Sequence, residues 1–136
     1  MRESIIGSKT FNFAVKIVDL YKELIDTKKE YVLSKQMLKA GTSIGANVRE
    51  ALEAQSKKDF IAKLFIALKE AVETEYWIDF LAETEYIEKE VYKTKSLQNV
   101  EGLKDGFNRN YQLSSRQLST YIFGGVLVST GLLRLG

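Results

Sequence analysis

Apolar residues recur at intervals of three and four along the first ninety positions, the spacing that keeps one face of an α-helix apolar. The first such run spans residues 8–27, and Ser8 is a suitable N-cap for it. The spacing predicts a core-facing helix whose apolar positions are Phe11, Ala14, Val18, Tyr21 and Ile25, widened by Val15, Ile17 and Leu24.

A second helix is predicted over residues 32–55. Gly41 and Gly45 lie in its middle, and each glycine in a helix interior costs about 1 kcal/mol relative to alanine. Because small residues allow another backbone to approach, we expect a close helix contact there; a local kink or break is the alternative. The apolar stripe consists of Leu33, Met37, Ala40, Gly41, Ile44, Val48 and Ala51.

A third helix is predicted over residues 57–87, where Ser56 and Asp59 form a Ser-x-x-Asp capping box before an apolar run. That run consists of Phe60, Leu64, Ala67, Leu68, Ala71, Glu75, Ile78 and Leu81. A second apolar flank is formed by Phe65, Val72, Tyr76 and Trp77. A helix that is apolar on more than one face has more than one neighbour, as in a bundle or an oligomer.

The rest of the chain predicts structure less strongly. A weak fourth helix begins at about residue 95, where helical spacing joins Leu97, Val100, Leu103 and Phe107. Residues 109–136 have no clean amphipathic period, and we expect them to be irregular. No linker or repeat divides the sequence, so residues 1–136 are predicted to form a single domain.

Composition narrows the chemistry of this 136-residue chain, because it contains no Pro, no Cys and no His. The lack of Pro favours long helices. Without Cys and His there is no thiolate metal site, no catalytic triad and no imidazole base. A ferritin-like di-iron site also needs His. We therefore expect no enzymatic activity, no catalytic residue, no metal and no cofactor.

No segment predicts a membrane span. The most apolar stretch, residues 121–135, contains glycines and an arginine and is shorter than a span of about 20 residues. Residues 1–7 lack the apolar core of a signal peptide. The expected location is therefore cytoplasmic, without membrane contact.

Charge is unevenly distributed along the chain, although its net charge is only +2. The balance is +4 over residues 1–63, −6 over residues 64–91 and +4 over residues 92–136. The first two helices can therefore face the acidic half of the third, within the chain or across an interface.

Basic side chains gather on the second helix and at the start of the third. Lys35 and Lys39 are four residues apart and share a helix face. We interpret them as part of a candidate nucleic-acid-binding surface for the phosphates of RNA or DNA, extended by Arg49, Lys57, Lys58 and Lys63. The alternative is that these residues are solvated or pair with the acidic half of the third helix.

Two further groups of side chains have competing interpretations. For Ser43, Asn47, Glu50, Glu70 and Glu75 we predict a buried hydrogen-bond network that fixes helix register, with a ligand pocket or a Mg²⁺ or Ca²⁺ site as the alternative. The second group is aromatic, and its helical spacing and acidic surroundings favour packing or a subunit interface over a stacking platform for bases. It consists of Tyr76, Trp77, Phe80 and Tyr86.

Two motifs carry a family resemblance: Ser-Ile-Gly-Ala-Asn-x-x-Glu-Ala at residues 43–51 and Lys-Glu-Ala-x-Glu-Thr-x-Tyr-Trp at residues 69–77. Over residues 8–90 the chain resembles the four-helix-bundle family of 23S rRNA intervening-sequence proteins. The resemblance implies an all-α, antiparallel up-down four-helix bundle, a homopentameric ring and no attached enzymatic activity. The accessory proteins of diversity-generating retroelements are similar to this family in fold. They bind nucleic acid and a reverse transcriptase.

The C-terminal segment departs from the family pattern. One possible set of codons for residues 112–119 encodes Thr-Ile-Val-Lys-Thr-Thr-Ile when it is read two bases later. The family often ends its fourth helix in an Ile-Val-Lys-Thr-like stretch. Our hypothesis is therefore that this segment is translated in a shifted reading frame. For the whole chain the expected function is that of a non-catalytic binding or accessory protein for structured RNA or DNA. The alternative is a purely structural homo-oligomer that engages a protein partner.

Overall fold

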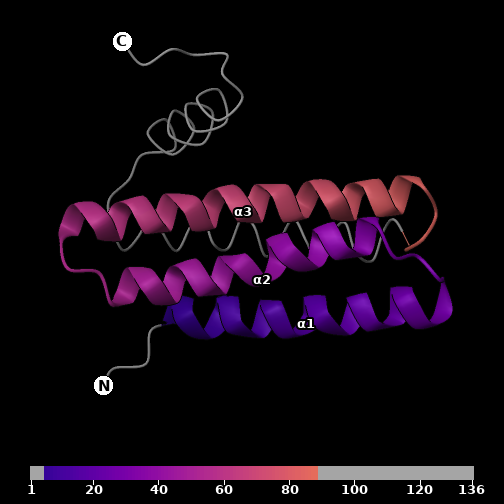
Figure 1. The fold of residues 1–136 in the computed structure, drawn as a ribbon, viewed down its shortest axis with the longest axis horizontal. Helices are drawn as coiled ribbons and strands as arrows, with labels where there is room; N and C mark the ends of the chain where they lie inside the picture. The colour runs from indigo at the N-terminus through magenta and orange to yellow at the C-terminus, as the bar shows by residue number, and fades with distance from the viewer. Residues whose placement is uncertain (1–4, 89–136) are drawn as a thin grey trace, which may run out of the picture.

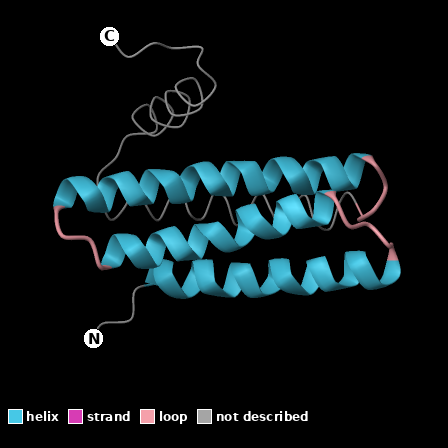
Figure 2. Cartoon of the chain, in the orientation of Figure 1, coloured by secondary structure: helices cyan, strands magenta, loops and turns pink. Residues whose placement is uncertain are grey.

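The structure, a computed structural model, describes residues 5–88. This part of the chain is all-α and has no strand, as Figure 2 shows. Its helices are α1 (Ile5–Thr27), α2 (Leu33–Leu52) and α3 (Lys57–Glu83). The three predicted helices are thus confirmed, with ends shifted by a few residues. The predicted fourth helix and residues 109–136 lie outside the described residues.

The three helices lie side by side, and α2 packs against both α1 and α3 (Figure 1). Gly45 of α2 lies beside Thr10, whereas Gly41 lies beside Ile17. Residue numbers therefore rise along α1 as they fall along α2, and the chain turns back on itself in the short connection between them. This arrangement makes α2 the central element of the described fold.

The glycines of α2 allow the close approach of α1 that the sequence predicts. The helix continues unbroken through both positions, so the alternative of a break is wrong. A Cβ atom at Gly41 would lie 2.8 Å from Cγ1 of Ile17, and one at Gly45 would lie 3.4 Å from the carbonyl oxygen of Thr10. Because glycine has no side chain, the backbones of α1 and α2 can lie close together at these two positions.

The predicted core faces of α2 and α3 are confirmed. In α2 the side chains of the stripe from Met37 to Ala51 are buried, and Leu33 packs against them. In α3 the stripe from Leu64 to Leu81 is buried, except that Glu75 is only half-buried and the neighbouring Thr74 takes the interior position.

The predicted stripe of α1 needs correction. Phe11 and Val15 are exposed, and Val18 is only half-buried. Two apolar stripes run side by side along this helix, and helical spacing alone does not determine which one packs against α2. The stripe that does so consists of Ile6, Thr10, Phe13, Ile17, Leu20 and Leu24.

The helix starts show one confirmed cap and one that is wrong. The Oγ atom of Ser56 accepts a hydrogen bond from the backbone N–H of Asp59 at 3.1 Å, as the capping box predicts. Ser8 caps nothing, because α1 is already helical at Ile5. The segment that joins α1 to α2 contains an additional cap.

That additional cap is the buried carboxylate of Glu30. Its Oε1 atom accepts hydrogen bonds from the backbone N–H groups of Val32 and Leu33 at 3.0 and 2.9 Å. Its Oε2 atom accepts one from the N–H of Ser34 at 2.6 Å, and the Ser34 hydroxyl donates back to the Glu30 carbonyl at 2.8 Å. Burial by itself raises the pKa of Glu30, but these hydrogen bonds together outweigh it and lower the pKa below 4.5.

Candidate nucleic-acid interface

Lys35, Lys39 and Arg49, here called the basic stripe, are all exposed on α2. Lys39 lies one turn after Lys35, and Arg49 follows Lys35 by two heptads, so the three side chains share one face of the helix. At 1.5 Å per residue the stripe is about 21 Å long. The structure therefore brings together these three predicted residues.

Between Lys39 and Arg49, the face of α2 that carries the basic stripe has short side chains and no acidic residue. Thr42 and Ala46 lie between Lys39 and Arg49, on the same face, and both side chains are short. No acidic residue occurs in the sequence between Glu30 and Glu50. An anionic ligand could therefore approach the backbone of α2 closely without meeting a carboxylate of the same helix.

Lys57 and Lys58 extend the positive charge at the end of α2 that carries Arg49. Both are exposed in the first turn of α3, directly after the Ser56 cap. The helix dipole disfavours cations at this end of a helix, so α3 gains no stability from these two charges. They remain candidates for contact with an external anion.

Lys63 differs from the other predicted cations because it is held by a neighbouring helix. Its Nζ atom forms an ion pair with Oε2 of Glu50 at 2.8 Å. The hydrogen bond to Glu50, reinforced by the charge of that carboxylate, raises the pKa of Lys63. This ion pair between α2 and α3 neutralises the charge locally, so Lys63 is the weakest candidate of the set.

Lys39 interacts electrostatically with Glu70 of α3. Burial is the main cause of a raised pKa at Glu70, and the negative charge of Glu73 raises it further. The charges of Lys69 and Lys39 oppose this shift. The alternative interpretation, in which these cations pair with the acidic half of α3, therefore applies at Lys39, whereas Lys63 is paired with Glu50 of α2.

The predicted buried polar network needs correction, because none of its members is buried in the described structure. The hydroxyl of Ser43 donates to the carbonyl of Lys39 at 2.6 Å, and Nδ2 of Asn47 donates to the carbonyl of Ser43 at 2.8 Å. These bonds lie within one helix and fix no register. Glu50 is 60% exposed in its side chain, and Glu70 and Glu75 are half-buried.

Within residues 5–88 the buried polar side chains are those of Thr10, Glu30, Ser34 and Thr74. Their hydrogen bonds are also local: the hydroxyl of Thr10 donates to the carbonyl of Ile6 at 2.8 Å, and that of Thr74 donates to the carbonyl of Glu70 at 2.7 Å. Each hydroxyl is thus satisfied by its own helix, which is the usual arrangement for a Thr or Ser inside a helix.

The aromatic residues of α3 form a cluster on its outer side. The ring of Tyr76 lies 5.1 Å from that of Trp77, edge to face, and 6.1 Å from that of Phe80. Tyr76 is 56% and Phe80 is 41% exposed, whereas Trp77 is half-buried and packs against the core. The Nε1 atom of Trp77 is buried without a hydrogen-bond partner among the described residues.

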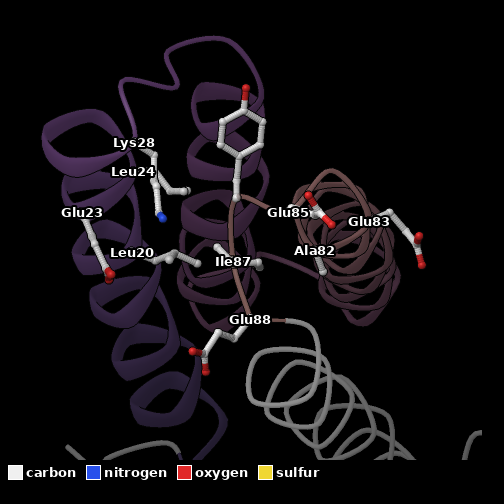
Figure 3. Close-up of a pocket in the computed structure, with 10 residues that line it drawn as sticks. Leu20, Glu23, Leu24, Lys28, Ala82, Glu83, Glu85, Ile87 and Glu88 are labelled. Atoms are coloured by element: carbon white, nitrogen blue, oxygen red, sulfur yellow. The ribbon is translucent and has the colours of Figure 1, made fainter.

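A hollow of about 800 Å³ lies where α1 and α3 end. Figure 3 shows Leu20, Leu24 and Ile87 in this hollow, with Glu23 and Glu88 at its edge. Tyr86, the fourth predicted aromatic residue, also lines it, apart from the cluster on α3. The charged side chains around it are mostly acidic, so it does not extend the candidate phosphate surface.

Metal binding and membrane insertion are two other functions to consider for residues 5–88. Within residues 5–88 no three carboxylates are grouped as they would be to hold a metal ion. No helix in this range has both the length and the apolar character needed to cross a membrane.

Residues 5–88 form an all-α structure that carries the basic stripe on the outside of α2 and the cluster of Tyr76, Trp77 and Phe80 on the outside of α3. The model of the 23S rRNA-intervening sequence protein family matches residues 2–104, and the chain belongs to that family. The predicted resemblance is therefore confirmed. No curated protein matches the chain.

A solved structure is also similar to this chain. It is a protein of unknown function from the S23 ribosomal protein family of Bacteroides thetaiotaomicron VPI-5482. The two chains are 53% identical, with a TM-score of 0.69, and the match covers 74% of this chain and 96% of that chain. The family and this relative are thus known by sequence and fold, without an assigned function.

Proposed function

We propose that the protein is a non-catalytic binding protein that contacts phosphates of structured RNA or DNA through the basic stripe of α2. The observation that carries the proposal is the exposure of Lys35, Lys39 and Arg49 on one face of a helix that has no carboxylate between Glu30 and Glu50. Lys57 and Lys58 continue the surface. Phosphate contacts of this kind depend on charge and give little sequence specificity.

A salt titration of binding to total cellular RNA tests this proposal. Each phosphate contact contributes about −0.9 to the slope of log affinity against log salt for a duplex. The double variant Lys35→Glu/Lys39→Glu removes two contacts and is expected to make the slope less steep by about 2, with weaker binding at low salt. The measurement is fluorescence anisotropy of labelled RNA over a range of salt concentrations.

The matched control changes two exposed lysines of α1 in the same way, Lys16→Glu/Lys22→Glu. It alters the net charge by the same amount on a different helix. Equal binding by the two double variants would remove the basic stripe from the proposal. Binding that does not weaken with salt in the unchanged protein would reject phosphate recognition altogether.

For the complete chain we propose an antiparallel four-helix bundle that assembles into a homopentamer in the cytoplasm. The helical spacing of Leu97, Val100, Leu103 and Phe107 supports a fourth helix. The exposure of Phe11 and Val15 on the second apolar stripe of α1 supports self-association, because such side chains gain by being covered. In a ring, one modest basic stripe would be repeated in each subunit, and binding would become multivalent.

The alternative is a structural homo-oligomer that engages a protein partner and no nucleic acid. The exposed aromatic residues of α3 favour it, since exposed aromatic side chains are enriched at protein interfaces. Native mass spectrometry of the protein from its own host distinguishes the two functions. Bound nucleic acid supports the first, and an oligomer with bound protein but no nucleic acid supports the second.

A further inference from the structure

The second half of α3 has a surface chemistry opposite to that of the basic stripe. From Ala71 to Glu83, where α3 ends, the sequence contains four acidic residues and no basic one. Within this segment Tyr76 and Phe80 are exposed, and the same outer side of α3 carries the exposed Ile66 one turn before Glu70. The nucleic-acid proposal uses none of these residues.

Helical spacing places acidic and aromatic side chains next to one another on this outer side. Glu73 precedes Tyr76 by three residues and Phe80 by seven, so the three share one face. Glu73 is exposed. We call Ile66, Glu73, Tyr76, Trp77 and Phe80 the aromatic face. The half-buried Lys69 is a basic neighbour on α3 that lies between Ile66 and Glu73 and whose charge acts on Glu70.

The chemistry of the aromatic face selects a cationic and partly apolar ligand. The faces of aromatic rings attract ammonium and guanidinium groups, and a nearby carboxylate adds to this attraction. The same carboxylates repel a phosphate backbone. A small inorganic cation would leave the exposed apolar side chains uncovered. A ligand that covers them must have an apolar surface of its own.

We propose that the aromatic face is a docking site for a basic amphipathic helix of a partner protein. Lys or Arg side chains of the partner would lie against Glu73 and the rings of Tyr76 and Phe80. Its apolar side chains would cover Ile66 and the exposed edge of the aromatic cluster. The site is separate from the basic stripe, so one molecule could hold an anionic and a cationic partner at once.

Trp77 makes the site directly observable, because it is the only Trp of the chain and its ring contacts both Tyr76 and Phe80. The probe is a synthetic helical peptide of Leu, Ala and Arg that lacks Trp. A matched peptide has Glu in place of each Arg. Titration of the full-length protein with the basic peptide is expected to shift the emission of Trp77, and the acidic peptide is expected to leave it unchanged.

Variants then locate the binding site. Glu73→Lys and the double variant Tyr76→Ser/Phe80→Ser are each expected to weaken binding of the basic peptide by about tenfold or more. Matched controls lie on α1, where Glu23→Lys makes the same charge change and Ile5→Ser removes an exposed apolar side chain. Circular dichroism of every variant verifies that helix content is retained. Lys35→Glu/Lys39→Glu is expected to leave binding of the peptide unweakened.

Four outcomes would overturn the proposal. They are equal binding of the basic and acidic peptides, equal effects of the α3 and α1 variants, a shift of Trp77 emission by total RNA, and dispersal of a homo-oligomer by Tyr76→Ser/Phe80→Ser. The last outcome would assign the aromatic face to a second copy of this chain. Failure here leaves the nucleic-acid proposal standing, because that proposal is tested by variants of α2.

Discussion

The outward faces of α2 and α3 differ in charge and in exposed apolar side chains. Both helices bury a continuous apolar stripe, and the two stripes pack against each other. On the outside, α2 presents Lys35, Lys39 and Arg49 with short side chains between them, whereas α3 presents Tyr76 and Phe80 beside acidic residues. Two helices that are equivalent for stability are thus opposite in what they could bind.

The contrast also extends to how each helix uses its small and large residues. In α2 the glycines lie toward α1 and allow the two backbones to approach. In α3 large side chains occur on the outer side as well as in the core, so its apolar surface exceeds what the described helices cover. The excess on α3 indicates a further contact.

The largest expected effect separates the inner face of α3 from its outer face. Leu68 is 1% exposed, so Leu68→Ala is expected to lower the free energy of unfolding by about 2–5 kcal/mol. Phe80→Ala removes a larger side chain but from the outer face, and a loss below about 1 kcal/mol is expected. Urea denaturation followed by circular dichroism measures both. A loss for Phe80→Ala that matches Leu68→Ala would mean that the outer face is covered in the folded protein.

The next effect tests the close contact between α1 and α2. Leucine at position 41 would meet the buried side chain of Ile17, and Gly41→Leu is expected to destabilise the protein by about 2–3 kcal/mol through overpacking. The control is Ala46→Leu, which introduces the same side chain at an exposed position of the same helix. Thermal unfolding compares the two variants. Equal melting temperatures would show that α1 can move away from α2 at little cost.

A smaller effect concerns the start of α2. Glu30→Gln keeps the shape of the side chain but removes the charge that accepts three backbone hydrogen bonds, and a loss of about 1–2 kcal/mol at pH 7 is expected. The pKa of Glu30 is lowered below 4.5 in the folded protein. Its contribution is therefore present above pH 4.5 and is lost as the pH falls through the folded pKa.

Urea denaturation of both proteins at pH 7 and at pH 3 measures this linkage. The difference in stability between the unchanged protein and Glu30→Gln should shrink at the lower pH, because the carboxylate becomes protonated. If this difference in stability stays the same at pH 3 and pH 7, the charge of Glu30 is not what stabilises the start of α2.

The sequence predicts the core of α2 correctly and that of α1 only in part, because Ile17 and Leu24 are buried as expected whereas Phe11 and Val15 are exposed. One physical reason accounts for this difference. Along α2 a single apolar stripe is bordered by polar residues, so its inward face is unambiguous. Along α1 the stripe through Phe11 and Val18 lies beside the stripe through Phe13 and Ile17, and periodicity fits both. Only the packing against Gly41 and its neighbours determines which stripe is buried.

The candidate site shows the same limit. The shared face of Lys35, Lys39 and Arg49 follows from helical spacing within one element, so it could be predicted. The ion pair of Lys63 with Glu50 depends on how α2 and α3 are rotated against each other, which spacing does not determine. The cap by Glu30 depends on the left-handed backbone of Lys29, with a φ of 56°, for which the sequence gives no signal.

The smallest expected effect lies where the two outer faces meet, at Glu70. Its pKa is raised above 4.5, first by burial and then by the charge of Glu73, so the ionised form is disfavoured in the folded protein. Glu70 therefore contributes to the free energy of unfolding at low pH, where it is protonated. This contribution is lost as the pH rises through the pKa of Glu70 in the folded protein. Because Glu70 is only half-buried and solvent screens its charge, Glu70→Gln is expected to stabilise the protein at pH 7 by only a few tenths of a kcal/mol.

Lys39 determines how this last effect should be interpreted, because its charge favours ionised Glu70. Removing it with Lys39→Met should make the gain from Glu70→Gln larger, and a double-mutant cycle measured by urea denaturation at pH 7 isolates the coupling. A coupling above the error means that Lys39 is partly neutralised by α3, so that Lys35 and Arg49 contribute more than Lys39 to any phosphate binding. Zero coupling leaves the full charge of Lys39 on the basic stripe and separates the outer faces of α2 and α3 completely.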